Sequence, residues 1–456
     1  MKTNGRNQKH CQHLIILLLC CLGLTFFFAC QKKAEETPPF AYAYDEDGPM
    51  KILIANDIHY IAPELYSDHD LFFDFALNDG KMMVDIEELT DAFILQVLEE
   101  KPQALVLNGD ITFNGETLSH EVLAKKLQVL KEAGITVLVL PGNHDINNPF
   151  AREFREGQVY YASTISAQQF KEIYKDFGYD YNISYDEETL SYFFPLSPSL
   201  YLLMLDVNQY EKNMALSSDP SGKLKDSTVL WIKDCFEKAK AEDAQVVIFV
   251  HQNVLDQSVV HNSDYTIKNS ELLKNLMVEY GYTLSFSGHI HMQRITQRSY
   301  NDVLLTDVAN SSLVTYVQGY GQLVYTPKQS FVYDFIPLDV DRYLPSFGTD
   351  RYEGEMDDFF KYSYAFYYLL AYQRSMNNLA AYEQLTELEK TQMAEAQALM
   401  NTYYFAGMPM EIRPEVRLMP GYFLWKEHTE IPQRDNFLNM FVEPTTDPWR
   451  VVIEIP

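Results

Sequence analysis

The sequence predicts an α/β fold, because short apolar runs typical of buried strands alternate along the chain with segments of helical periodicity. One run, residues 246–250, has no polar interruption, which is typical of a strand covered on both faces. Polar residues follow directly after several runs, at the edge where sheets of this class bind ligands. The first strands and helices alternate in the order 51–55, 86–100, 104–107, 118–133 and 136–140.

Length and composition indicate a folded protein with a large core. The chain has 456 residues, of which 47% are hydrophobic, and it includes 32 Tyr and 28 Phe. This much apolar side-chain surface excludes a chain that is disordered throughout. The length allows one large domain and a smaller one.

The amino-terminal residues predict an export signal. Three basic residues precede an apolar stretch, residues 13–29, that lacks Asp, Glu, Lys and Arg. The stretch ends at Cys30 in a segment that resembles a bacterial lipoprotein cleavage site, with Phe27 where Leu is usual. We expect residues 1–30 to be a signal and lipid anchor, residues 31–48 a tether, and the protein to be exported and held at the membrane through Cys30. Secretion after ordinary signal cleavage and an uncleaved anchor are the alternatives.

Charge and cysteine content narrow the partners of the folded body. Without residues 1–29, the chain has 33 Lys and Arg against 64 Asp and Glu, a net charge of −31. Such a surface repels nucleic acid and anionic lipid headgroups, so we expect no long nucleic acid as partner. Only Cys235 lies beyond Cys30, which excludes a disulfide within the body. Its helical context predicts a buried small residue.

The first strand, residues 51–55, leads into two candidate metal ligands. Asp57 and His59 are two positions apart, so on extended backbone their side chains point the same way. Residues 61–85 follow as an acidic, aromatic-rich insertion, which we expect to be a surface loop, with lining of a substrate cleft as the alternative.

The next two strands end in the same manner. After residues 104–107, Gly109 allows a tight turn that delivers Asp110 at the end of the strand. After residues 136–140, a Pro-Gly turn is followed by Asn143, His144 and Asp145. Three successive junctions with polar side chains are hard to attribute to chance.

The second half of the chain repeats this arrangement. His251 ends the run 246–250, and His289 and His291 follow a strand at 283–287. Asp206 also ends a strand, where substrate contact and loop capping are both open. The runs 303–308, 323–325 and 331–336 predict strands that complete a second sheet.

The pattern changes after residue 340. Residues 341–456 contain two amphipathic helices, 356–377 and 385–402, followed by a proline-punctuated remainder. We interpret them as an accessory segment packed on the catalytic body. The aromatic stripe of the first helix (Phe359, Phe360, Tyr364, Tyr367 and Tyr368) is expected to be core or docking surface rather than a binding groove.

The polar residues at these junctions suit a metal site. Five of the eleven histidines fall there, and the donors are oxygen and nitrogen without thiolate. This donor set suits Mn, Fe, Zn, Ni or Mg. Seven ligands are too many for one tetrahedral ion, so we expect two ions with a shared carboxylate. The seven are Asp57, His59, Asp110, Asn143, His251, His289 and His291.

As an ordered set, these motifs resemble those of the calcineurin-like metallophosphoesterases over roughly residues 50–340. The resemblance implies a catalytic domain at 49–340 with a four-layer αββα sandwich, two packed β-sheets flanked by helices. It also implies a role for each residue. Asp57, His59 and His291 would hold one ion, Asn143, His251 and His289 the other, and Asp110 would bridge them. His144 would assist the leaving group, with Asp145 orienting it.

The implied activity is hydrolysis of a small phosphate ester by a hydroxide that two metal ions activate, without an organic cofactor. We expect phosphodiesters to be preferred slightly. A phosphomonoesterase or nucleotidase for phosphate scavenging is the first alternative. A non-catalytic surface binding protein that keeps the metals for structure is the second, and the His144–Asp145 pair argues against it.

Overall fold

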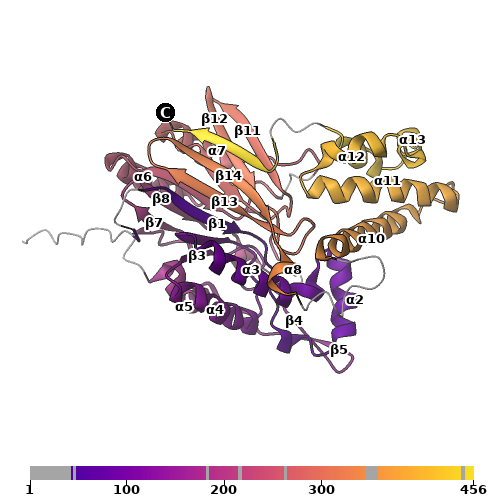
Figure 1. Ribbon diagram of the computed structural model, residues 1–456, viewed down its shortest axis with the longest axis horizontal. Coiled ribbons are helices and arrows are strands. Elements are labelled where there is room, and N and C mark those ends of the chain that lie inside the picture. The colour runs from indigo at the N-terminus through magenta and orange to yellow at the C-terminus, as the bar shows by residue number, and fades with distance from the viewer. Residues whose placement is uncertain are drawn as a thin grey trace, which may run out of the picture. The chain divides into compact units, whose positions relative to one another are not determined.

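Two mixed β-sheets form the centre of the fold, and helices lie against their outer faces (Figure 1). The computed structural model describes residues 43–44, 48–180, 184–213, 218–260, 264–345, 358–442 and 447–455. The expected signal segment, with Cys30, and most of the tether lie outside these residues. Within the described ranges, no helix has both the length and the apolar character needed to cross a membrane.

The first sheet has six strands in the order β15-β14-β13-β1-β2-β3. They are β1 (Met50–Ala55), β2 (Ala104–Asn108), β3 (Thr136–Leu140), β13 (Gly319–Thr326), β14 (Ser330–Pro337) and β15 (Arg450–Glu454). β1, β2 and β3 run parallel, whereas β13 pairs antiparallel with β1, with Leu323 opposite Ile52. The prediction that β13 and β14 belong to the second sheet is therefore wrong. Apolar alternation identifies a strand but does not identify its partner.

The second sheet has seven strands in the order β11-β12-β10-β9-β8-β7-β6. They are β6 (Ser184–Tyr185), β7 (Tyr192–Ser197), β8 (Leu200–Leu205), β9 (Gln245–Val250), β10 (Leu284–Ser287), β11 (Arg294–Tyr300) and β12 (Val303–Ala309). The four central strands, β8, β9, β10 and β12, are parallel. Parallel strands end at one edge of a sheet, so the loops after β9 and β10 lie together there.

Strand β9 is buried on both faces, as its apolar run predicts. Val247 and Phe249 join the apolar core that also contains residues of the first sheet. Val246 and Ile248 belong to a separate core with residues of α6 (Asp226–Ala241) and α7 (Ser270–Tyr280). Cys235 of α6 is buried in this second core, and burial raises the pKa of its thiol far above the ordinary value.

Helices α3 (Ile86–Glu100), α4 (Thr117–Glu132) and α5 (Ala167–Ile173) lie on the opposite side of the sheets from α6 and α7 (Figure 1). The order of layers is thus helix, sheet, sheet, helix, which confirms the predicted sandwich. A small two-stranded sheet, β4 (Arg152–Arg155) and β5 (Gln158–Tyr161), stands apart from both large sheets.

The insertion at residues 61–85 contains a helix, α2 (His69–Asp79), and is not the loop that the sequence predicted. The helix begins where the Asp68 carboxylate accepts a hydrogen bond from the Leu71 amide, and it ends at Gly80 with φ +85°. Aspartate before a helix and glycine after it are ordinary cap signals, so these two residues could have revealed it. Its weak amphipathic pattern hid the helix.

The carboxyl-terminal helices have a core of their own. They are α10 (Phe359–Leu379), α11 (Glu387–Phe405), α12 (Pro409–Val416), α13 (Pro420–Glu427) and α14 (Gln433–Asn439). Trp425 is fully buried there, and its indole N–H donates to the Met393 carbonyl at 2.8 Å. The chain then returns to the first sheet, where β15 pairs with β14. The last described residues therefore belong to the first sheet of the sandwich.

A buried carboxyl group, Glu116, stands at the start of α4. One carboxylate oxygen accepts hydrogen bonds from the Asn114 amide at 3.0 Å and the Ser119 hydroxyl at 3.4 Å. The other oxygen has no hydrogen-bond partner among the described residues. Burial raises the pKa of Glu116 from 4.5 to about 7, although the bond from Asn114 acts in the opposite direction.

The folded protein should therefore lose stability as pH rises from 4.5 towards 7, because it binds this proton more tightly than the unfolded chain does. Glu116→Gln should remove this loss, which amounts to about 3 kcal/mol. Urea unfolding of both proteins between pH 4.5 and 8 measures the difference. Glu121→Gln, an exposed residue of α4, is the control, and parallel profiles for wild type and Glu116→Gln would contradict the prediction.

Candidate metal centre

The predicted ligands meet where strands of the two sheets end. Asp57 follows β1 and Asp110 follows β2, both in the first sheet, while His251 and His289 follow β9 and β10 in the second. Five of the seven expected ligands have left-handed backbone, with φ between 46° and 67°. They are Asp57, His59, Asp110, His289 and His291. Residues other than glycine adopt this conformation at a cost of about 1–3 kcal/mol each, and such strain concentrates at functional sites.

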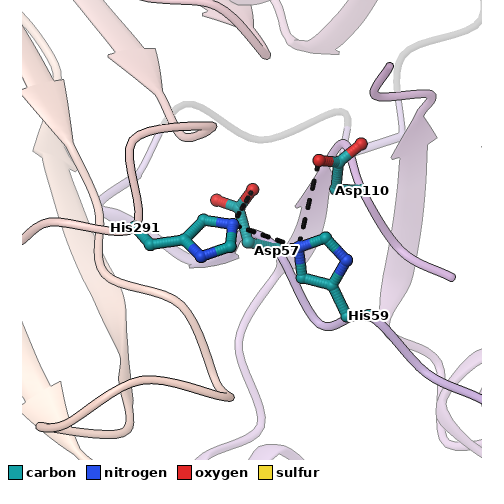
Figure 2. A group of neighbouring side chains, drawn as sticks. All are labelled: Asp57, His59, Asp110 and His291. Atoms are coloured by element: carbon teal, nitrogen blue, oxygen red, sulfur yellow. Dashed lines mark hydrogen bonds and ion pairs between the residues drawn. The ribbon is translucent and has the colours of Figure 1, made fainter. Parts of the chain in front are cut away.

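A first cluster consists of Asp57, His59, Asp110 and His291, whose possible ligand atoms all lie within 4.8 Å of one another (Figure 2). The two histidine Nε2 atoms are 3.0 Å apart. His291 Nε2 lies 3.3 Å from an Asp57 oxygen, and His59 Nε2 lies 3.9 Å from an Asp110 oxygen. Four donors thus converge on one point.

A second cluster consists of Asp110, His251 and His289, again with all ligand atoms within 4.8 Å. His251 Nε2 lies 3.2 Å from Asp110 Oδ2. Asp110 belongs to both clusters, which is the position a carboxylate must have to bridge two cations. The structure therefore brings together six of the seven expected ligands.

Asn143, the seventh, lines the same cavity as His289 and His291, which has a volume of about 600 Å³. Its side chain is nearly buried, and Oδ1 has no hydrogen-bond partner within the described ranges. A buried oxygen without a partner is costly unless something outside the protein chain contacts it. Its role as a ligand stays a prediction.

Hydrogen bonds behind the ligands hold several of them in place. The Asp57 carboxylate accepts from the His289 amide at 3.0 Å, and Asp110 Oδ1 accepts from the His144 amide at 2.8 Å. His251 Nδ1 donates to the Asn108 carbonyl at 3.1 Å, which leaves Nε2 as the ring atom available to a cation. Such outer contacts fix the orientation of metal ligands.

The protonation preferences of these groups follow from burial and from one another. Burial, followed by the nearby Lys81 charge, holds the pKa of His59 well below its ordinary value, and burial lowers the pKa of His289 to about 3. Burial alone would raise the pKa of Asp110, but the imidazoles of His251 and His144 together lower it well below the ordinary value. Burial alone would lower the pKa of His251, but the neighbouring Asp110 carboxylate raises it to about 9. His59 and His289 thus favour the neutral form that binds cations, whereas His251 must first release a proton to bind an ion.

The donors fit two hard or borderline cations. They offer oxygen and nitrogen only, they are largely buried, and Asn143 Oδ1 lacks a hydrogen-bond partner among the described residues.

His144 faces the cavity beside this cluster. Its Nδ1 lies 2.9 Å from both the Phe113 carbonyl and the Asn114 side-chain oxygen. Its Nε2 lies 4.0 Å from Asp110 Oδ2, and the side chain is 26% exposed. The ring is therefore held from one side and presents Nε2 on the other.

Asp145 does not orient the His144 ring, so this predicted role is wrong. Its carboxylate accepts hydrogen bonds from the Thr112 amide at 2.9 Å, the Thr112 hydroxyl at 2.7 Å and the Gly142 amide at 2.8 Å. It is fully buried, and burial raises its pKa to about 7. Adjacent residues in a turn point to different sides. The Asp145 carboxylate therefore joins the loop after β2, through Thr112, to the loop after β3, through Gly142.

Asp206 is a loop cap and not a cavity residue. Its carboxylate accepts from the Leu190 amide at 3.1 Å and the Asn208 amide at 3.0 Å. The sequence left this role open between capping and substrate contact, and these hydrogen bonds select capping.

Two cations, Lys81 and Arg374, lie in the cavity wall. Lys81 belongs to the insertion at 61–85, so the alternative that this insertion lines a cleft is confirmed at its end, whereas Arg374 escaped the sequence analysis. Arg374 lies on α10, together with Tyr367, Leu370 and Ala371 of the same wall. The prediction that the α10 aromatic stripe has only core or docking contacts is therefore wrong for Tyr367. Positions 367, 370, 371 and 374 share one helical face, and that spacing was the available signal.

Two family models match the chain. The model described as calcineurin-like phosphoesterase matches residues 50–293. A second, described as the C-terminal domain of cyclic nucleotide phosphodiesterase, matches residues 339–447. An Arcobacter nitrofigilis protein named "Probable glycerophosphodiester phosphodiesterase GpdQ" is 24% identical over 233 residues, which are 50% of this chain and 71% of that protein.

Solved structures resemble the chain more distantly. A dimetal phosphatase from Danio rerio is 13% identical, with a TM-score of 0.45, and the match covers 64% of this chain and 97% of the phosphatase chain. The purple acid phosphatase PPD1 from yellow lupin, Lupinus luteus, is 12% identical, with a TM-score of 0.40, and covers 64% of this chain and 52% of its own.

His251→Ala should lower the number of divalent ions bound per chain from about two to one or fewer, because it removes a ligand of the second cluster. Mass spectrometry of the protein after metal loading and desalting measures this number. His69→Ala, which removes an exposed histidine of α2, is the control. Equal metal content in the two variants would rule out a ligand role for His251.

Proposed function

We infer that small phosphodiesters are the preferred substrates of this chain, which belongs to the calcineurin-like phosphoesterase family and is therefore a phosphoric ester hydrolase. The observation that carries metal-dependent hydrolysis at this site is the position of Asp110. It is shared by two ligand clusters at the wall of a cavity of about 600 Å³. A cavity of this volume suits a small organic phosphate rather than a polymer.

When bound, two metal ions would supply charge neutralisation for phosphoryl oxygens and an activated water as nucleophile. The residues of the chain contribute the rest. Asp110 stays ionised because of the imidazoles around it, which keeps a negative ligand at the shared position. His144 donates Nδ1–H to the Phe113 carbonyl, so in its protonated form it presents the second proton on Nε2, towards the cavity. That proton can pass to the oxygen of the leaving alcohol.

The preference for diesters rests on the organic walls of the cavity. Tyr316, Tyr367 and Phe405 line it, and aromatic rings suit the second ester group that a diester carries. The names attached to the Arcobacter relative and to the C-terminal family model both describe phosphodiesterases. Cyclic nucleotides are therefore the first physiological class to test.

Export and anchoring through Cys30 are part of the proposal. The support is the basic start, the uncharged apolar stretch at 13–29 and the cysteine that follows it. An enzyme placed outside the membrane would meet small phosphate esters from the surroundings.

Substrate comparison tests the activity. Purified residues 31–456, stripped of metal and reloaded with Mn, Ni, Zn or Mg, should hydrolyse bis-p-nitrophenyl phosphate with a kcat/KM at least about tenfold above that for p-nitrophenyl phosphate. 3′,5′-cyclic AMP against 5′-AMP repeats the comparison. His144→Ala should lower kcat about 100-fold or more while metal content stays unchanged. Faster monoester turnover would identify a phosphomonoesterase or nucleotidase, and no turnover by the metal-loaded protein would point to a binding protein.

Lipid attachment has a separate test. In a bacterial host grown with radioactive palmitate, the full chain should become labelled, whereas Cys30→Ala should not, because the thiol is the attachment point. Cys21→Ala, within the expected signal, is the control and should keep the label. Equal labelling of the Cys30 variant would contradict the anchor.

A further inference from the structure

One wall of the cavity comes from outside the strand junctions. Helix α10 contributes Tyr367, Leu370, Ala371 and Arg374, and α11 contributes Asn401, Thr402 and Phe405. The α10 residues have the spacing i, i+3, i+4 and i+7, so a single helical face looks into the cavity. The helices of the carboxyl-terminal segment are thus part of the wall around the metal centre.

The guanidinium of Arg374 packs directly over the turn that follows α2. A Cβ atom added to Gly80 would lie 2.5 Å from Arg374 Nη2 and 2.6 Å from Nη1. Glycine at this position, with φ +85°, leaves the space that the guanidinium fills. Lys81 is the next residue, and both Lys81 and Arg374 line the cavity.

The turn that carries Lys81 is fixed from two sides. The Met82 amide donates to the Val314 carbonyl at 3.0 Å and to the Tyr367 hydroxyl at 3.0 Å. The Tyr367 hydroxyl in turn donates to the Val314 carbonyl. Lys81 itself is 6% exposed, and its Nζ lies 5.7 Å from the centre of the Phe113 ring. Helix α10 therefore positions both cations. Arg374 is a residue of the helix, and Tyr367 of the same helix fixes the turn that carries Lys81.

The cavity wall contains two cationic side chains, although the protein as a whole is strongly acidic. The whole chain has a formal net charge of −28, yet Lys81 and Arg374 line a cavity that also contains Asp110 and Asp264. They are the two Lys or Arg side chains among the cavity residues in the described part of the chain. Lys81 also lies close enough to His59 for its charge to act on that imidazole.

We propose that Lys81 and Arg374 bind the phosphate-ester substrate through its non-bridging oxygens, so that α10 makes the carboxyl-terminal segment part of the substrate site. The proposal rests on the proposed function, whose substrate class it deepens. Lys81, on the His59 side, neutralises charge next to the metal centre. The planar fork of Arg374 can donate two parallel hydrogen bonds to a phosphate, which also sets the orientation of the ester.

Kinetics of Arg374→Gln and Lys81→Gln test this. Each variant should raise KM for bis-p-nitrophenyl phosphate about tenfold or more and change kcat less than about threefold. Metal content and thermal midpoint should stay at wild-type values. Arg374→Lys should recover part of the loss, because it restores the charge without the fork. Lys361→Gln is the matched control, since it removes a charge from an exposed position of the same helix, outside the cavity.

Binding of inorganic phosphate gives a second readout that needs no turnover. Calorimetric titration of the manganese-loaded full body, residues 31–456, should show about tenfold weaker phosphate binding by Arg374→Gln than by the Lys361→Gln control. Unchanged KM and unchanged phosphate affinity in both cavity variants would overturn the proposal, as would loss of affinity explained by lost metal. If wild type hydrolyses no ester, the proposed function fails, while the titration still decides whether the two cations bind phosphate.

Discussion

The Asp110 carboxylate is the group on which the site depends. It is buried, negatively charged and shared by two clusters of metal-ligand candidates, and a buried charge is stable only with partners around it. Asp110 Oδ1 accepts a hydrogen bond from the His144 amide, and Asp110 Oδ2 lies 3.2 Å from His251 Nε2. Residues from the first and the second sheet therefore have to meet at this one side chain.

Two asparagines next to the ligands join the sheets at this point. Asn56 donates to the Ser287 carbonyl at 2.5 Å, and Asn108 donates to the Val250 carbonyl at 3.1 Å and the Phe286 carbonyl at 3.2 Å. Each amide satisfies carbonyl groups at the ends of strands in the opposite sheet. The candidate ligands follow these same strand ends, so the packing of the two sheets also sets the positions of the candidate ligands relative to one another. The buried Asp145 extends it to the loop after β3.

The carboxyl-terminal helices complete the cavity, and residues of α10 such as Phe359 and Tyr367 also pack against the sandwich core. Their own apolar cluster surrounds Trp425, and it also includes Ile290 and Met292, which flank His291. Packing of the accessory helices thus begins at the ligand-bearing loop itself. This connection explains why α10 can place Arg374 in the cavity wall.

Local sequence determined the strands, their polar ends and therefore the candidate ligands. An apolar run followed by Asp, Asn or His carries its own signal, because the change from apolar to polar residues where a strand ends is visible in neighbouring positions of the chain. The tertiary structure decided which sheet β13 joins, which way the Asp145 side chain points and that Arg374 and Lys81 line the same cavity. Each depends on contacts between residues far apart in the chain or on the path of a turn, which composition and periodicity do not encode.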